Sequence, residues 1–212
     1  MSARIAVLFF ALASACALQG CPAPVVQLNR LPSSSPLPKA VPIPADSEYV
    51  HEPSGYAFPI IVANFQRVAL VRYDTSGLDV SAGYNSGIPG CLIRLTIYVS
   101  PAPKMSFMGA DPAVVRDTET EWLNSAYDRW KREIASSHPQ ARLVLEDERE
   151  QAGLRGKKAV YNIDTDQSEL FVFLDRRTWF LTYRVSFPAS CSAEAHTVLQ
   201  GFFASWHGRS AG

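Results

Sequence analysis

The chain has 212 residues, of which 47% are hydrophobic, 11% aromatic and 19% charged. This composition excludes an intrinsically disordered chain, because it supplies ample apolar surface for a core. Twenty basic residues stand against twenty acidic ones. Because no net charge steers the protein toward nucleic acid, we expect no nucleic-acid partner.

An apolar leader, residues 1–20, begins the chain and carries one positive charge at Arg4. Its apolar segment runs from Ile5 to Leu18, about 14 residues, whereas crossing about 30 Å of hydrocarbon at about 1.5 Å per residue requires roughly 20. The segment is too short for a transmembrane helix and is typical of an export signal. We therefore assign residues 1–20 to a signal peptide.

The leader closes with Leu18, Gln19, Gly20 and Cys21. These residues resemble the lipobox of bacterial lipoproteins, in which an aliphatic residue and a small residue precede the cysteine that receives the lipid. The resemblance implies a thioether-linked diacylglycerol and an N-acyl chain on Cys21, which together give stable membrane attachment. Pro22 stands where many inner-membrane lipoproteins of Gram-negative bacteria carry Asp. The resemblance therefore favours the outer membrane, facing the periplasm.

Two other processing routes stay open for the leader. Ala13, Ser14 and Ala15 form an acceptable small-residue cleavage site, which would secrete the protein without a lipid. Cys16 follows them and is a second lipidation candidate, but it lacks the preferred leucine three residues before it. Cys21 is the expected lipidation site.

Residues 22–46 contain seven prolines and the triplet Ser33 to Ser35, without a sustained hydrophobic period. This composition is typical of a linker, because each proline fixes φ and removes a hydrogen-bond donor. At about 3.1 Å per residue, an extended spacer of this kind could hold a domain up to roughly 75 Å from the lipid. We therefore expect a lipidated cysteine and linker over 21–46, and a single domain over 47–212.

β-branched and aromatic residues dominate the start of this domain. They predict three strands before the long helix: the first lies in the run that leads from Tyr56 to Tyr73, the second at 79–84 and the third at 91–99. From Arg67 to Tyr73 both faces are apolar in the middle, so we expect a central strand that is covered on both faces. Strand 91–99 alternates apolar with polar residues, which indicates a half-buried antiparallel strand.

The hydrophobic period then changes to that of a helix over 112–137. Asp111 is the expected N-cap, Pro112 stands at the first helical position, and His138 with Pro139 supplies the stop. Four strand-like runs follow with short turns between them, which predicts an antiparallel meander: 141–150, 157–163, 169–174 and 178–187. A final amphipathic helix is predicted over 192–206.

These elements predict an α+β fold, with an antiparallel sheet of about six or seven strands and both helices packed on it. The element order across Ser47 to Trp206 resembles the PsbP-like α/β/α sandwich, a fold that recurs in small bacterial lipoproteins and in photosystem-associated proteins. That resemblance implies binding or scaffold roles more often than catalysis. It assigns no functional residue.

The cysteines give the strongest chemical inference within the domain. If Cys16 leaves with the signal and Cys21 carries the lipid, the exported domain retains Cys91 and Cys191. An even pair in an oxidising compartment predicts a disulfide, which would close a loop of about 100 residues. Two separate buried thiols are the alternative. A third interpretation is a nucleophilic Cys191 with His196 nearby in the sequence.

Motifs for metals, cofactors or catalysis are not found. Asp164, Asp166 and Ser168 match the first positions of a calcium loop, but Glu169 comes too early and the required glycine is missing, so a hairpin turn is expected. The histidines lack zinc-site spacing: His51, His138, His196 and His207. GxSxG, GxGxxG and P-loop patterns are absent. We predict no catalytic residue, metal or cofactor.

Two turns are basic, one with Arg155, Lys157 and Lys158, the other with Arg176 and Arg177. Solvated hairpin ends explain them, and a small basic patch toward lipid headgroups or an acidic partner is the alternative.

The sequence therefore predicts a lipid-anchored, non-enzymatic domain of the bacterial envelope that presents a binding or scaffold surface to a protein partner. The alternative is a small-molecule carrier or an envelope hydrolase, with a pocket built from residues that are far apart in the sequence.

Overall fold

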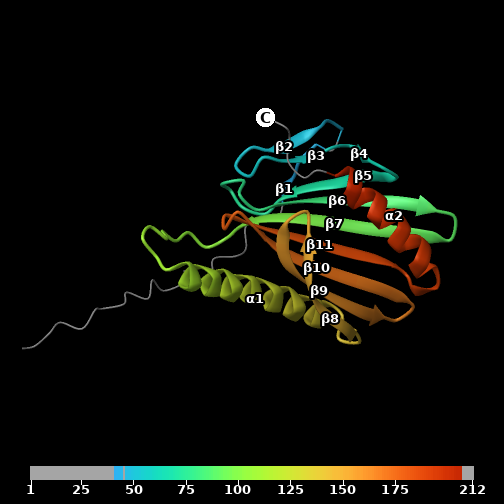
Figure 1. The fold of residues 1–212 in the computed structure, drawn as a ribbon. Coiled ribbons are helices and arrows are strands. Elements are labelled where there is room, and N and C mark those ends of the chain that lie inside the picture. Colours follow the sequence, from blue (N-terminus) through green and yellow to red (C-terminus); the bar gives the residue numbers. More distant parts are fainter. Residues whose placement is uncertain (1–40, 45, 207–212) are drawn as a thin grey trace, which may run out of the picture. The chain divides into compact units, whose positions relative to one another are not determined.

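The computed structural model describes residues 41–44 and 46–206 (Figure 1). The predicted signal peptide, Cys21 and most of the predicted linker lie outside these residues, and so does His207. Leader cleavage and lipidation therefore stay predictions. The α+β class and the antiparallel sheet are confirmed.

Eleven strands and two α-helices follow one another along the described part of the chain. The strands are β1 Val41–Pro42, β2 Tyr49–His51, β3 Tyr56–Phe58, β4 Ile61–Val62, β5 Phe65–Arg72, β6 Val80–Ile88, β7 Cys91–Pro101, β8 Arg142–Gln151, β9 Leu154–Ile163, β10 Asp166–Asp175 and β11 Trp179–Pro188. The helices are α1 Pro112–Ser137 and α2 Ser192–Ser205, and a short 3-10 helix, Ala189–Cys191, precedes α2.

Two antiparallel meanders make up a nine-stranded sheet in the order β1-β5-β6-β7-β11-β10-β9-β8, with β4 also paired to β5. β7 and β11 join the meanders, and Ile97 pairs with Tyr183 in their register. The meander predicted after the long helix is confirmed. α1 carries the chain from β7, in the middle of the sheet, to β8 at its far edge.

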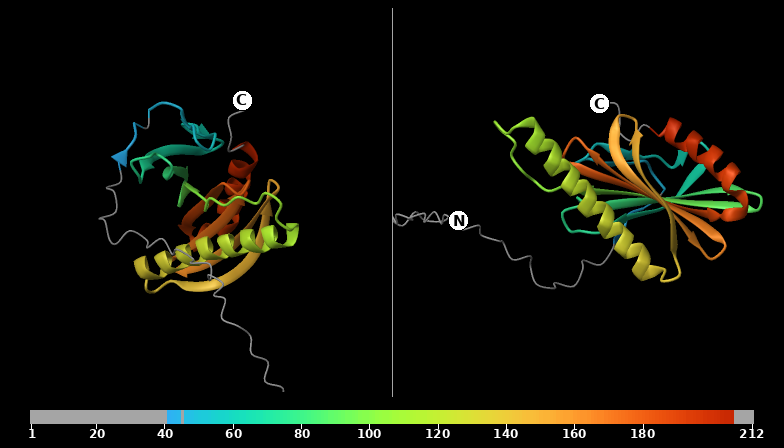
Figure 2. Two further views of the ribbon diagram at one scale, coloured as in Figure 1. Left: turned by 90° about the vertical axis from the view of Figure 1, so that its left-hand side faces the viewer. Right: turned by 60° about the horizontal axis from the view of Figure 1, so that its bottom comes forward.

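The sheet lies between the two helices, as the views in Figure 2 show. Side-chain alternation along β10 explains this arrangement, because successive residues of a strand point to opposite faces. Leu170 and Val172 join the core beneath α1, whereas Phe171 and Phe173 join the core beneath α2. The β2-β3 hairpin adds Tyr56 and Phe58 to the α2 side.

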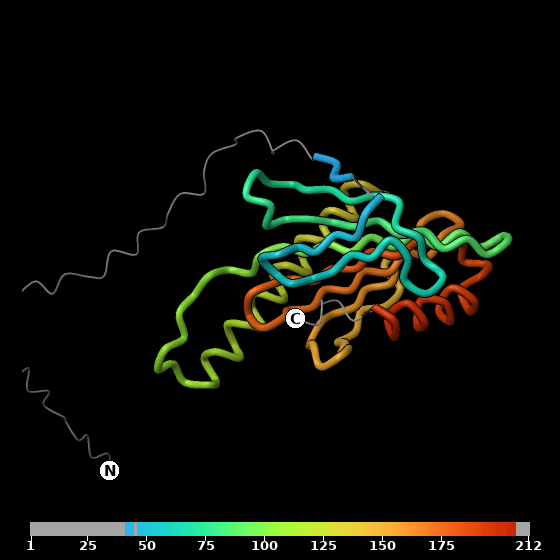
Figure 3. Tube along the Cα trace, turned by 90° about the horizontal axis from the view of Figure 1, so that it is seen from above, coloured from blue at the N-terminus to red at the C-terminus, as the bar shows by residue number. Residues whose placement is uncertain are grey.

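Local signals fix both ends of α1. The Asp111 carboxylate accepts a hydrogen bond from the Ala113 N–H at 2.7 Å, and Pro112 occupies the first helical position. The His138 N–H donates to the Ile134 carbonyl at 2.8 Å, where the helix ends. Before α1, residues 102–111 project beyond the ends of the strands (Figure 3).

Two expectations about the sheet are corrected. It has nine strands rather than six or seven, because β1 and β4 contain two residues each and are too short to produce a hydrophobic period. β5 is not covered on both faces, because Gln66, Val68 and Ala69 are exposed to solvent, Val68 by 53%. The register of β5 with β6 shifts between Arg67 and Ala69, so the residues before and after this irregularity do not follow one inward–outward alternation. A strict two-residue period therefore assigns apolar residues to both faces.

His51 links the β2-β3 hairpin to the turn after β5. The buried imidazole donates from Nε2 to the Gly77 carbonyl at 2.7 Å, and its Nδ1 lies 2.6 Å from the Ser54 hydroxyl. Burial lowers the pKa of His51. In the same turn the Asp74 carboxylate accepts from the Leu78 N–H at 2.9 Å. His51 is therefore a neutral structural link.

Asp79 follows this turn and is electrostatically unfavourable in its charged form. Burial, and after it the neighbouring Asp74, raise its pKa from 3.8 to about 6, and Arg129 opposes the shift. The folded state therefore holds the proton of Asp79 more tightly than the unfolded state does.

We expect Asp79→Asn to be more stable than the wild-type protein above pH 6. Because the folded pKa is raised, the favourable contribution of protonated Asp79 is complete below about pH 4 and is lost as the pH rises through about 6. The neutral amide does not undergo this loss. Urea unfolding from pH 4 to pH 8 measures the difference, and an advantage that shrinks with rising pH would contradict the assignment.

Gly156 of β9 is expected to tolerate no side chain, because a Cβ there would lie 2.3 Å from Cδ1 of Phe173 and 2.5 Å from the Val172 carbonyl oxygen. Gly156→Ala should lower the free energy of unfolding by about 1–3 kcal/mol in urea denaturation. Gly87→Ala is the matched control, since nothing lies within 4 Å of its Cβ position. Equal losses in the two variants would refute the steric explanation.

Candidate functional site

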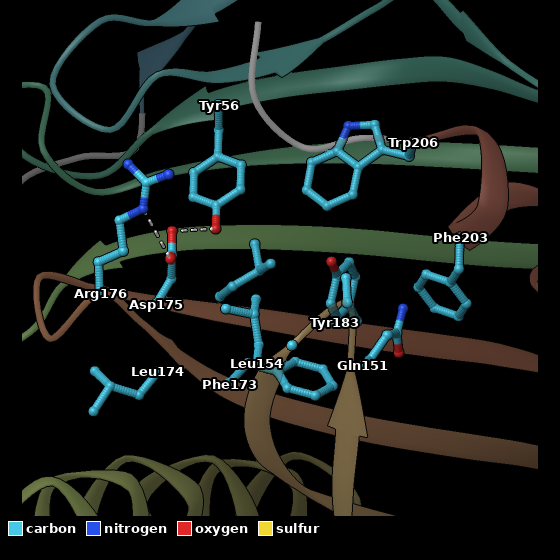
Figure 4. A pocket seen from close by; sticks show the side chains of 13 residues that line it. Tyr56, Gln151, Leu154, Phe173, Leu174, Asp175, Arg176, Tyr183, Phe203 and Trp206 are labelled. Carbon is cyan, nitrogen blue, oxygen red and sulfur yellow. Dashed lines mark hydrogen bonds and ion pairs between the residues drawn. The ribbon is translucent and has the colours of Figure 1, made fainter. Parts of the chain in front are cut away.

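An open cleft of about 430 Å³ lies on the α2 side of the sheet, where the β8-β9 and β10-β11 turns approach the end of α2. Five aromatic side chains line it: Tyr56, Phe173, Tyr183, Phe203 and Trp206 (Figure 4). We call this space the aromatic cleft. Its volume is within the range of small-molecule sites, about 300–1,000 Å³.

The aromatic wall is held in place by contacts among its own members. The rings of Tyr56 and Trp206 stack with centroids 5.8 Å apart, and Tyr183 meets both Trp206 and Phe203 edge to face. The Trp206 indole donates from Nε1 to the Ala57 carbonyl at 3.0 Å. Such pairs fix ring orientation, so this wall of the cleft is preformed.

One corner of the cleft is polar. The Asp175 carboxylate is 4% exposed and accepts a 2.7 Å hydrogen bond from the Tyr56 hydroxyl, while Nε of Arg176 lies 4.0 Å away (Figure 4). Burial raises the pKa of Tyr183 well above its ordinary value, and Tyr56 and Asp175 raise it further. The phenol of Tyr183 is therefore neutral, and the cleft combines a broad apolar wall with one charged corner.

A second hollow of about 210 Å³ adjoins the cleft and shares Gly153, Leu174 and Arg176 with it. Its remaining lining is Glu119, Leu123, Arg155 and Arg177. We call it the arginine groove.

The structure brings together part of the predicted basic patch. Arg155, Arg176 and Arg177 meet in the arginine groove. Lys157 and Lys158 are directed elsewhere: Nζ of Lys157 lies 5.7 Å from the Tyr127 ring centroid, and Nζ of Lys158 lies 3.2 Å from the Glu169 carboxylate.

A polar cluster around the buried Glu169 ties α2 to β10. Oε1 of Glu169 lies 2.9 Å from Nε2 of His196, 3.0 Å from Nε2 of Gln167 and 3.2 Å from Nζ of Lys158. The Ser192 hydroxyl lies 3.5 Å from Nδ1 of His196. Serine, histidine and glutamate stand here in the order of a hydrolytic triad, but the carboxylate is shared with a lysine, and the cluster lies outside the cleft and groove. We interpret it as structural.

Cys91 and Cys191 form a disulfide in the structure, with Cα atoms 5.9 Å apart. Cys191 therefore carries no free thiolate, and His196 contacts Glu169 instead. Asp164 and Thr165 form the turn between β9 and β10. Within residues 41–44 and 46–206, no three His, Cys, Asp or Glu side chains gather as metal ligands, and no helix is long and apolar enough to cross a membrane.

The sequence did not identify the cleft. Phe203 and Trp206 fall within or at the end of the last predicted helix, where an apolar stripe does not distinguish the wall of a cleft from core packing. Tyr56 and Asp175 carried no motif. The two basic turns, which carry Arg155 and the pair Arg176 and Arg177, are the sequence signals that lie near the site.

No protein-family model matches the chain, and no curated protein matches it. Among solved structures, the chain is similar to the solution structure of cyanobacterial PsbP (CyanoP) from Synechocystis sp. PCC 6803. The two share 15% sequence identity, the match covers 76% of this chain and 90% of that chain, and the TM-score is 0.41. We draw no function from this likeness, and the fold assignment rests on the strands and helices themselves.

Proposed function

We propose that this chain is a lipid-anchored, non-enzymatic binding protein of the bacterial envelope, and that the aromatic cleft holds the apolar body of a small ligand. The observation that carries the proposal is the cleft itself, in which five aromatic rings from β3, β10, β11 and the end of α2 surround about 430 Å³. A concave space of this size favours a small molecule over the flat contact of a protein partner.

The groups in the cleft support binding rather than catalysis. The Tyr56 hydroxyl and the Asp175 carboxylate are hydrogen-bonded to each other. Among the described residues that line the cleft there is no serine, cysteine or histidine. The lining therefore offers ring faces and one charged corner for recognition.

The anchor and the compartment belong to the same proposal. The lipobox resemblance at Cys21 supports the lipid. The disulfide between Cys91 and Cys191 fits an oxidising compartment outside the cytoplasm. The proline-rich segment between the lipid and the sheet would give the domain reach from the membrane surface.

Filling the cleft should block binding of a neutral apolar probe. We expect N-phenyl-1-naphthylamine to bind the wild-type protein saturably with a rise in fluorescence, and Leu154→Trp to weaken its affinity at least about tenfold, because the indole takes up space in the cleft. Leu143→Trp is the matched control, since Leu143 lies outside the cleft and is 43% exposed. No binding to the wild type, or equal affinity in both variants, would contradict the site.

Mass spectrometry of the mature N-terminus tests the anchor. In a bacterial host that processes lipoproteins, we expect the chain to begin at Cys21 and to carry the diacylglycerol and N-acyl mass. Cys21→Ser should abolish the added mass, whereas Cys16→Ser should leave it unchanged. An unlipidated chain that begins at any other residue would refute the anchor, but it would leave the cleft proposal standing.

A further inference from the structure

The arginine groove adjoins the aromatic cleft, because Gly153, Leu174 and Arg176 line both hollows, and it lies against α1, which contributes Glu119 and Leu123. Arg155 lies near the start of β9, and Arg176 and Arg177 form the turn between β10 and β11. In the register of these strands Gly156 pairs with Phe173, so the two arginine-bearing segments lie side by side at one end of the sheet. A ligand that extends out of the cleft along this path meets three guanidinium groups.

Two of these guanidinium groups are already positioned. Arg177 forms an ion pair with Glu119 of α1 and lies 6.0 Å from the Phe107 ring centroid. Nη2 of Arg155 donates to the Thr120 hydroxyl at 3.3 Å. Arg176 has a side chain that is 72% exposed, with Nε 4.0 Å from Asp175. A side chain held in place before binding loses less conformational freedom when a ligand arrives.

The charges of this region leave a positive excess. Arg155, Arg176 and Arg177 contribute three positive charges, and Glu119 and Asp175 contribute two negative ones, so the difference is one positive charge. Asp175 is buried at the cleft corner and accepts from Tyr56, whereas Arg176 reaches solvent. The exposed part of the groove is therefore the positive part.

Arg176 and Arg177 have a backbone conformation that is uncommon for residues other than glycine. Arg176 has φ of 48° and Arg177 has φ of 60°, both in the left-handed region. The Thr178 N–H donates to the Asp175 carbonyl at 3.0 Å, which closes the turn. Turns with two positive φ values favour Asn-Gly, because glycine lacks a Cβ and asparagine tolerates the left-handed region better than arginine does. Strained backbone of this type is concentrated at ligand sites.

We infer that the arginine groove receives the anionic head of the same ligand whose apolar body lies in the aromatic cleft. The ligand class is an amphiphilic anion, with an apolar ring or chain that carries a phosphate, sulfonate or carboxylate. Guanidinium groups suit such heads because their paired N–H donors match two oxygens at once. This inference rests on the proposed function of the cleft and adds the charge of its ligand.

A matched pair of probes separates the two hollows. N-phenyl-1-naphthylamine is neutral, and 8-anilinonaphthalene-1-sulfonate has the same aromatic body with one sulfonate. Arg155 and Arg177 line the groove but not the cleft. We therefore expect the double variant Arg155→Gln with Arg177→Gln to bind the sulfonate probe about tenfold more weakly and the neutral probe unchanged. Raising the salt concentration should lower the affinity for the sulfonate probe more than the affinity for the neutral probe, because salt screens the exposed charges.

The control variant removes the same total charge elsewhere. Arg94 and Arg142 are exposed and lie outside the cleft and groove, so Arg94→Gln with Arg142→Gln should leave both affinities unchanged. Equal weakening of both probes in the groove variant would overturn the inference, because the arginines would then act on the shape of the cleft. Equal weakening of the sulfonate probe by both double variants would overturn it as well, because any positive charge would serve.

Competition identifies the source of the ligand. Displacement of the sulfonate probe by dodecyl phosphate supports a single-chain lipid, displacement by 1-naphthoate supports an aromatic acid, and displacement by neither overturns the inference. Sulfonate binding that depends on the arginines, without binding of the neutral probe, would support the groove and refute the cleft. Binding that appears only after deletion of residues 207–212 would assign the cleft to the protein's own C-terminal segment and overturn the inference.

Discussion

The pairing of β7 with β11 is the interaction on which the other features depend. It joins the two meanders into one sheet and fixes which residues of β11 face each helix. Because Tyr183 pairs with Ile97, it lies on the α2 side together with Phe173 of β10. The aromatic cleft then forms between this face, the β3 residue Tyr56 and the end of α2. A slip of one residue in this register would turn Tyr183 to the opposite face of the sheet from Ile97.

Most of the elements could be predicted because their signals are local. The 3.6-residue period, the Asp111 cap and the His138 stop determine α1 within a single stretch of sequence, and the structure follows them. β7 was equally clear from its alternation. The two-residue strands β1 and β4 have no period to detect, since only their pairing with β5 defines them. The bulge in β5 disturbed the parity on which its assignment depended.

The candidate site was much less predictable, because its parts are joined only by the fold. Tyr56, Asp175 and Trp206 lie in different elements, and no sequence spacing connects them. The basic turns were visible, but their composition did not show that Arg155 would join Arg176, whereas Lys158 would pair with Glu169 on the other face of β9. Arg155 and Lys158 point to opposite faces because side chains alternate along β9, and their partners can be assigned only when the register of β9 with β10 is known.

The position of α1 in the chain also has a consequence for the order of assembly. β5, β6 and β7 are neighbours in the sequence and can pair as soon as they are synthesised. The other edge of β7 pairs only with β11, which follows about 80 residues later, and such non-local pairing is slow. Until then the edge of β7 has unpaired backbone groups and is open to wrong partners. The disulfide from Cys91 to Cys191 crosses between the start of β7 and the segment just after β11. Once formed, it keeps the two strands near each other through any later opening of the sheet, so an oxidising environment protects the central seam between the meanders.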